Sequence, residues 1–134
     1  MELLSNYPPK VILALGESFS GNKDIFDWLL DNFPELAAFS SSVRGSTEAN
    51  DWLMKNKYYA FSALDQAIDG NESAADWLKK YDYTLELYLV DACNNKQEAI
   101  DFLNNNDFTV ISYLAQQINK FRDSMVYDHH KMHF

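Results

Sequence analysis

Gly70-Asn71-Glu72-Ser73-Ala74-Ala75-Asp76-Trp77-Leu78 is one copy of a pattern that recurs along most of the chain. Its signature is a triplet of Asp, an aromatic residue and Leu. The four triplets are Asp27-Trp28-Leu29, Asp51-Trp52-Leu53, Asp76-Trp77-Leu78 and Asp101-Phe102-Leu103. Self-similarity at a fixed period of about 25 residues predicts a tandem-repeat architecture.

Two further apolar series follow each triplet in the same register, and they predict the second half of the unit. The first consists of Phe39, Leu64, Leu89 and Leu114. The second lies four residues later and consists of Val43, Ile68, Cys93 and Ile118. Apolar residues at i and i+4 are typical of one helix face. Each unit therefore predicts a helical hairpin, with one helix through the triplet and another through these two series.

The residues that precede each triplet predict where one helix ends and the next begins. Gly21-Asn22, Gly45-Ser46 and Gly70-Asn71 pair a glycine with a capping residue, and Asn95-Lys96 replaces that pair in the fourth unit. A glycine can end a helix in the left-handed conformation, and Asn or Ser can cap the next helix.

The segment from Tyr83 to Val90 alternates in a way that also fits a β-strand. Its register with the other units favours a helix.

The two ends of the array predict caps. Pro8 and Pro9 suit the first turn of an opening helix, and the last unit continues its apolar stripe as far as Met125. The sequence thus predicts a single all-α domain over residues 1–134, with a half repeat over 8–20 and a tail over 126–134. The expected repeats are 21–44, 45–69, 70–94 and 95–125, with a longer C-terminal capping helix in the last.

Residues 8–125 resemble the α-α superhelix class of tandem repeats, which includes the tetratricopeptide, ankyrin and HEAT arrays. The resemblance is one of architecture and implies a right-handed α-α superhelix, or solenoid, of about four hairpins. The period is shorter than the roughly 33 to 47 residues of those families, and their sequence motifs are absent. The resemblance therefore points to the class and to no single family.

Composition favours a packed, acidic protein. Hydrophobic residues make up 47% of the chain, and the formal net charge is -9. Such a charge disfavours nucleic acid and anionic membranes as partners, and would attract a basic one. No apolar run approaches the length of a membrane span, so we expect a cytoplasmic protein without a membrane partner. Cys93, the one cysteine, lies in an apolar run and is expected to be a buried structural thiol.

The repeated Asp and aromatic residues are first expected to be structural. Asp27, Asp51, Asp76 and Asp101 could each accept a hydrogen bond from a neighbouring helix end or loop, or together form an acidic ladder for a basic peptide or a cation. Trp28, Trp52, Trp77 and Phe102 are expected to pack between repeats, with a ligand cage as the alternative.

Candidate binding residues are those that the repeat does not place. Tyr59, Tyr81 and Tyr88 are the tyrosines we expect to be exposed for a partner, whereas Tyr58 and Tyr83 recur in register and are expected in the core. His129 and His133 would share a helix face at i and i+4, a spacing that can hold zinc when other ligands complete the site. A solvated tail is the favoured interpretation, so no metal and no cofactor is expected.

We expect a non-enzymatic module that binds a protein or peptide, preferably a basic one, because arrays of hairpins present extended binding surfaces. Two alternatives stay open. One is a metal-dependent or hydrolytic enzyme that uses the repeated carboxylates and the C-terminal histidines. The other is a structural element that assembles end to end.

Overall fold

The computed structural model describes residues 1–131, and side chains for residues 1–125. Within that range the chain is helical and contains no strand. The short 3-10 helices are η1 (Leu4–Asn6) and η2 (Ser18–Ser20). The α-helices are α1 (Pro9–Glu17), α2 (Lys23–Asn32), α3 (Pro34–Val43), α4 (Thr47–Lys55), α5 (Tyr59–Ile68), α6 (Glu72–Lys80), α7 (Thr84–Cys93), α8 (Gln97–Asn105) and α9 (Thr109–Lys131). The Tyr83–Val90 segment is thus helical from Thr84 onward, as its register predicts, and α9 is the longest helix described.

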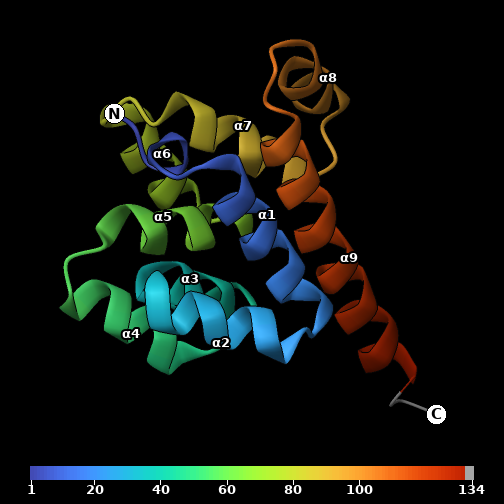
Figure 1. Cartoon of the computed structure of the whole chain (residues 1–134). Helices are drawn as coiled ribbons and strands as arrows, with labels where there is room; N and C mark the ends of the chain where they lie inside the picture. The colour runs from blue at the N-terminus through green and yellow to red at the C-terminus, as the bar shows by residue number, and fades with distance from the viewer. Residues whose placement is uncertain (132–134) are drawn as a thin grey trace.

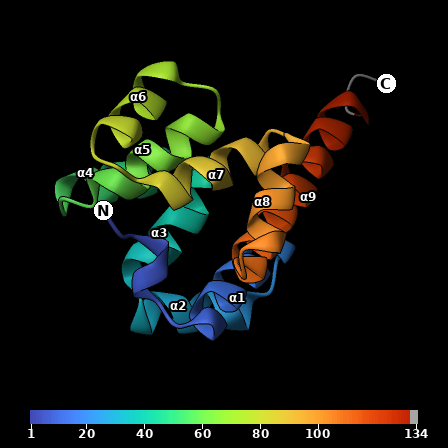
Figure 2. The same cartoon turned by 90° about the horizontal axis from the view of Figure 1, so that it is seen from above.

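The helices form two layers. The odd-numbered helices α3, α5, α7 and α9 pack against one another in succession, and the even-numbered helices lie outside them, each against its neighbours in the chain (Figures 1 and 2). The predicted apolar series face the inner layer, where Phe39, Leu64, Leu89 and Leu114 are fully buried. The Leu of every triplet is also fully buried, at Leu29, Leu53, Leu78 and Leu103. Burying one leucine side chain contributes roughly 1.5–3 kcal/mol, so these positions specify the core.

The predicted caps are confirmed for three units. Asn22, Ser46 and Asn71 each accept a hydrogen bond from the backbone N–H three residues ahead, at 3.0–3.1 Å. The preceding Gly21, Gly45 and Gly70 adopt positive φ. In the fourth unit Asn95 takes the left-handed position with φ 62°, and Lys96 makes no side-chain cap. The fourth unit therefore keeps the turn and loses the cap.

A second left-handed residue inside the hairpins, which the repeat pattern did not predict, sets their spacing. Lys57, Asp82 and Asp107 have φ of 67°, 59° and 66° at the ends of α4, α6 and α8. The residue after each donates its N–H back to the buried Leu of the triplet, at 2.8–2.9 Å. Only Phe33 separates α2 from α3, which explains why the first triplet spacing is one residue short.

The ends of the array meet. Helix α1 packs against α9 (Figure 1). Tyr113 of α9 donates a hydrogen bond to the carboxylate of Glu17. Helix α1 completes the inner layer, because it lies between α9 and the first hairpin. The structure supports an all-helical repeat fold whose inner helices close on one another.

The N-terminal segment crosses this inner layer. Leu4 is buried and donates its backbone N–H to Glu86 of α7 at 3.2 Å. The Tyr7 hydroxyl donates to Glu35 of α3 at 2.7 Å, and its ring lies 6.4 Å from that of Phe61 in α5. The segment therefore ties three successive inner helices together.

Candidate interaction grooves

Three equivalent grooves open between the hairpins. Each lies where the inner helix of one hairpin meets the outer helix of the next, so the same four helix positions line all three. The first groove, between α3 and α4, contains Ala38, Ser41, Ala49 and Trp52. The middle groove, between α5 and α6, contains Ala63, Gln66, Ala74 and Trp77. The third groove, between α7 and α8, contains Tyr88, Asp91, Ala99 and Phe102.

The triplet aromatics form the walls of these grooves. Trp52, Trp77 and Phe102 are half-buried and pack against the core, and each leaves part of its ring at the groove. Trp28, in the first outer helix, is 44% exposed. The triplet aromatics are therefore only partly buried, and among their ring-to-ring contacts in the described part of the chain only that of Phe102 with Tyr88 joins two units. A buried leucine and a half-exposed aromatic ring stand side by side in every triplet.

A second aromatic ring packs beside each of these walls. Tyr58 lies nearly parallel to Trp52, with ring centroids 5.7 Å apart, and Tyr83 lies nearly parallel to Trp77 at 5.8 Å. Phe108 takes the same place beside Phe102 at 6.5 Å. Tyr58 and Tyr83 are the in-register tyrosines expected in the core. Tyr83 is buried, whereas Tyr58 is 36% exposed. The paired rings stiffen each wall.

The middle groove brings together two of the three tyrosines expected to bind a partner. Tyr59 and Tyr81 both line it and are 46% and 42% exposed. Met54, 45% exposed, lies at the same groove. The groove has a volume of about 510 Å³, and no charged side chain lines it. Exposed aromatic and methionine side chains around a hollow are typical of a protein-interaction surface.

The third tyrosine that we expected to be exposed for a partner packs against a neighbouring ring instead. Tyr88 is half-buried and stacks on Phe102, with ring centroids 3.8 Å apart and planes 8° from parallel. Its position in α7 corresponds to Ala38 in α3 and Ala63 in α5. The third groove is smaller, about 240 Å³, than the first at about 310 Å³ and the middle at about 510 Å³. Tyr88 therefore occupies space that alanine leaves open in the other two.

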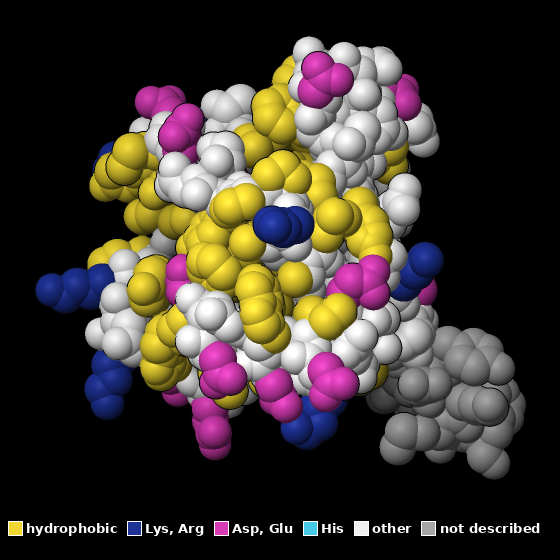
Figure 3. Space-filling model, viewed as in Figure 1, with side chains coloured by type: hydrophobic (Ala, Val, Ile, Leu, Met, Phe, Trp, Pro, Cys, Tyr) yellow, Lys and Arg dark blue, Asp and Glu magenta, His cyan; other side chains and the backbone are white. Residues whose placement is uncertain are grey.

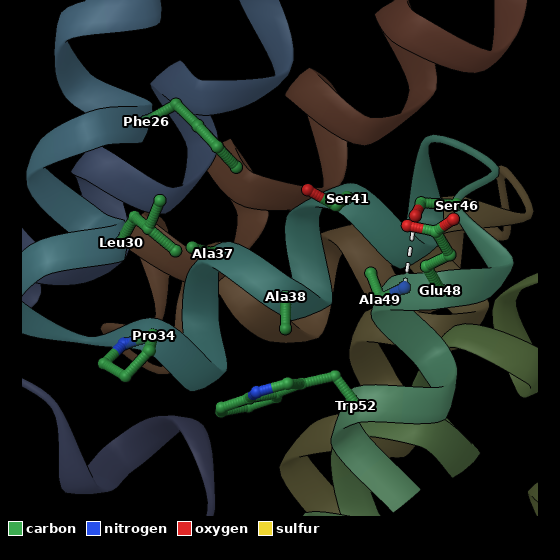
Figure 4. Close-up of a pocket in the computed structure, with 10 residues that line it drawn as sticks. All are labelled: Phe26, Leu30, Pro34, Ala37, Ala38, Ser41, Ser46, Glu48, Ala49 and Trp52. Carbon is green, nitrogen blue, oxygen red and sulfur yellow. Dashed lines mark hydrogen bonds between the residues drawn. The ribbon is translucent and has the colours of Figure 1, made fainter.

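The first groove combines an apolar floor with one acidic side chain. The Trp52 indole extends from α4 toward Pro34, with Ala38 next to it (Figure 4). Leu30 of α2 borders the same hollow, and Glu48 stands at the other end beside the capping Ser46. The groove can thus accept an apolar group on the indole and a cationic group near Glu48.

The repeated Asp residues do not form a site. Asp27 pairs with Lys23 of its own helix at 2.6 Å, and Asp101 accepts from Gln97, also of its own helix, at 2.9 Å. Asp51 and Asp76 are exposed. Among the described residues, none of the four accepts the backbone hydrogen bond that we expected from a neighbouring helix or loop. The structure spreads them over four separate outer helices, so they make no compact acidic cluster.

The remaining reactive side chains are buried or lie outside the described range. Burial raises the pKa of the Cys93 thiol to about 12, which keeps it protonated and agrees with a structural thiol. Residues 1–125 contain no group of three or more His, Cys, Asp or Glu that could hold a metal ion. The imidazoles of His129 and His133 lie outside the described residues. None of the helices described is long and apolar enough to cross a membrane.

The equivalence of Ala38, Ala63 and Tyr88 is the feature that sequence reasoning missed. The repeat register contained the signal, because it aligns a tyrosine with two alanines beside a row of aromatic residues. Without the structure nothing indicated that this position faces the aromatic of the next hairpin. Met54 was also missed, because it follows the triplet where the other units have Leu30, Lys79 and Asn104.

Comparison with known proteins identifies no family. No family model matches the chain, and neither a curated protein nor a solved structure matches it.

Proposed function

We propose that the protein is a non-enzymatic interaction module that holds a segment of another protein in the grooves between its hairpins. The middle groove carries the proposal, because Tyr59, Tyr81 and Met54 expose apolar surface around a hollow that already has an aromatic wall. Tyrosine and methionine are enriched at protein interfaces. Covering these side chains would remove apolar surface from water, which stabilises a complex by about 25 cal/mol for each Å².

The charge of the protein selects a basic partner in this proposal. The net charge of -9 attracts cationic chains from a distance, and Glu48 is placed to meet a cation inside the first groove. Hydrophobic side chains gather toward the middle of the face in Figure 3, around one basic side chain, and both acidic and basic side chains stand at its edge. Apolar anchors would then supply the affinity, and the net negative charge would raise the association rate. We also propose that the hairpins follow a right-handed superhelical path. This path is short, because α1 and α9 close it.

A peptide-display selection on the intact protein tests the function. We expect selected peptides to bind with a Kd that weakens as salt rises, and the double variant Tyr59→Ala/Tyr81→Ala to weaken binding at least tenfold. Leu13→Ala is the matched control, because Leu13 is 42% exposed on α1 and lines none of the three grooves. Failure to select any peptide at low salt, or equal binding by the double variant, would overturn the proposal.

The other two functions have less to support them. An end-to-end assembly needs free ends, and α1 already lies on α9. Light scattering should therefore find a dilute monomer.

An enzyme that uses the repeated carboxylates needs them together, and they lie on four different helices. Substitution of Asp51 and Asp76 by asparagine should change the salt dependence of peptide binding and leave its other properties unchanged.

A further inference from the structure

We infer that the first and middle grooves are subsites for aromatic side chains of a basic partner segment, stacked on Trp52 and Trp77 as Tyr88 stacks on Phe102. The inference rests on the proposed binding function and names the chemistry of the occupant. It starts from the third groove, where the chain supplies such an occupant itself.

The stacked pair in the third groove defines the geometry that the other two grooves lack. The ring centroids of Tyr88 and Phe102 lie 3.8 Å apart, and the two ring planes are 8° from parallel. The equivalent inner-helix residues are Ala38 and Ala63, which carry no ring. Both are half-buried at the groove, beside Trp52 and Trp77 respectively. A ring supplied from outside could therefore take the place that Tyr88 takes in the third groove.

At the open face of Trp52 or Trp77, an aromatic ring should bind more tightly than an aliphatic group of similar size. Offset-stacked aromatic pairs gain free energy beyond the apolar area that they bury. Tyr58 stacks on Trp52, and Tyr83 stacks on Trp77. Tyr81 also packs against Trp77, with ring centroids 4.8 Å apart, so the walls are ordered before a ligand binds. A wall that is already ordered loses little entropy on binding.

Charge complementarity sets the second feature of the occupant. Glu48 lines the same groove as Trp52, and no lysine or arginine lines the middle groove. Arg44 lies next to the first groove, with its guanidinium 5.1 Å from the ring centroid of Phe26. The third groove, already occupied by Tyr88, has Lys96 at its edge, paired with Asp91 at 3.4 Å. An aromatic residue next to a lysine or arginine would thus place its ring on the indole and its neighbour's charge near Glu48. The partner segment is basic as well as aromatic.

The test uses two synthetic peptides, acetyl-Gly-Ser-Lys-Tyr-Ser-Gly-amide and the same peptide with leucine in place of tyrosine. Binding is followed by the NMR shifts of the indole N–H groups, which report separately on Trp52 and Trp77. We expect the tyrosine peptide to shift both signals and to bind about fivefold more tightly than the leucine peptide. Equal affinities of the two peptides would overturn the aromatic inference while leaving the display result, and with it the proposed function, intact.

Three substitutions test which grooves are occupied: two fill an open groove with a tyrosine ring, and one removes the ring from the third groove. Ala63→Tyr should place a ring on Trp77, abolish the peptide-induced shift of Trp77 and preserve that of Trp52. Ala38→Tyr should do the reverse. Tyr88→Ala should open the third groove, and the tyrosine side-chain analogue p-cresol should then raise the Tm of this variant more than that of the wild type. A Trp77 shift that persists in Ala63→Tyr, or a Tyr88→Ala variant that p-cresol does not stabilise, would overturn the inference.

Discussion

Gly16 of α1 lies directly against Tyr113 of α9. A Cβ placed on Gly16 would come 3.4 Å from the tyrosine ring and 3.5 Å from the side chain of Gln117. The hydroxyl of the same tyrosine donates to Glu17, the next residue of α1. This contact joins the half repeat at the start of the chain to the last helix, and so closes the inner layer. The contact leaves room for a Cβ on Gly16 but not for a larger side chain.

Replacement of Gly16 by leucine should force α1 and α9 apart. Adding methylene groups to a well-packed contact typically costs about 1–3 kcal/mol. We expect urea unfolding to show a loss of that size in the free energy of unfolding. Gly16→Ala is the control, because its Cβ fits at 3.4 Å and alanine favours the helix. A leucine variant as stable as the alanine variant would contradict the close packing of the two helices.

Glu86→Ala should release the N-terminal segment. Glu86 is buried and accepts the Leu4 N–H at 3.2 Å, so its removal leaves a buried donor without a partner. Such a loss costs about 1–3 kcal/mol. Hydrogen exchange should speed up at the Leu4 amide, whereas Glu86→Gln keeps an acceptor and should retain most of the protection. Unchanged exchange at Leu4 in the alanine variant would show that the bond does not hold the segment.

Glu86 also illustrates how far the sequence could predict the structure. Its position is occupied by Leu36, Phe61 and Ile111 in the other inner helices, so the repeat identifies it as an exception. Its partner, Leu4, lies outside the repeat, and no periodic signal connects the two. Local features were predictable because caps, left-handed glycines and apolar stripes act within one hairpin.

The closure of the array and the grooves was not predictable in the same way. The curvature of a repeat array follows from small rotations between successive units. Whether α1 reaches α9 depends on the sum of these rotations and on the fit of Gly16 to Tyr113, which lie at opposite ends of the chain. The exposure of Tyr59 and Tyr81 could be predicted because the repeat does not place them in the core, whereas their meeting in one groove requires the packing of α5 on α6.

Lys57→Gly should stabilise the protein. Lys57 has φ 67°, a conformation in which its Cβ is strained by roughly 1–2 kcal/mol and glycine is not. The greater flexibility of glycine in the unfolded chain offsets part of that gain, so we expect a net increase of about 1 kcal/mol. Thermal unfolding should show a Tm higher by a few degrees. Lys55→Gly, two residues earlier at the end of α4, is the control and should lower the Tm.

Replacement of the buried pair Ser42 and Asp65 by Ala and Val should stabilise the protein at neutral pH. Asp65 accepts a hydrogen bond from Ser42, and its other carboxylate oxygen is buried without a partner. The corresponding pair between α5 and α7 is already apolar, Ala67 and Val90. The inner layer can therefore accommodate an alanine and a valine at such a position. Replacing both members of a buried polar pair by apolar groups is often neutral or stabilising.

The dependence of stability on pH distinguishes this effect from a change in packing alone. Burial raises the pKa of Asp65, so the folded state favours the protonated acid. The associated stability is fully present below the unfolded pKa of about 3.9 and is lost as pH rises through the higher folded value. The advantage of the Ser42→Ala/Asp65→Val variant over the wild type should therefore grow with pH across this window and then level off. The comparison of the two proteins by urea unfolding at several pH values isolates Asp65, because Glu86, whose pKa is also raised by burial, is common to both. An advantage independent of pH would mean that Asp65 is ionised in the fold at no cost.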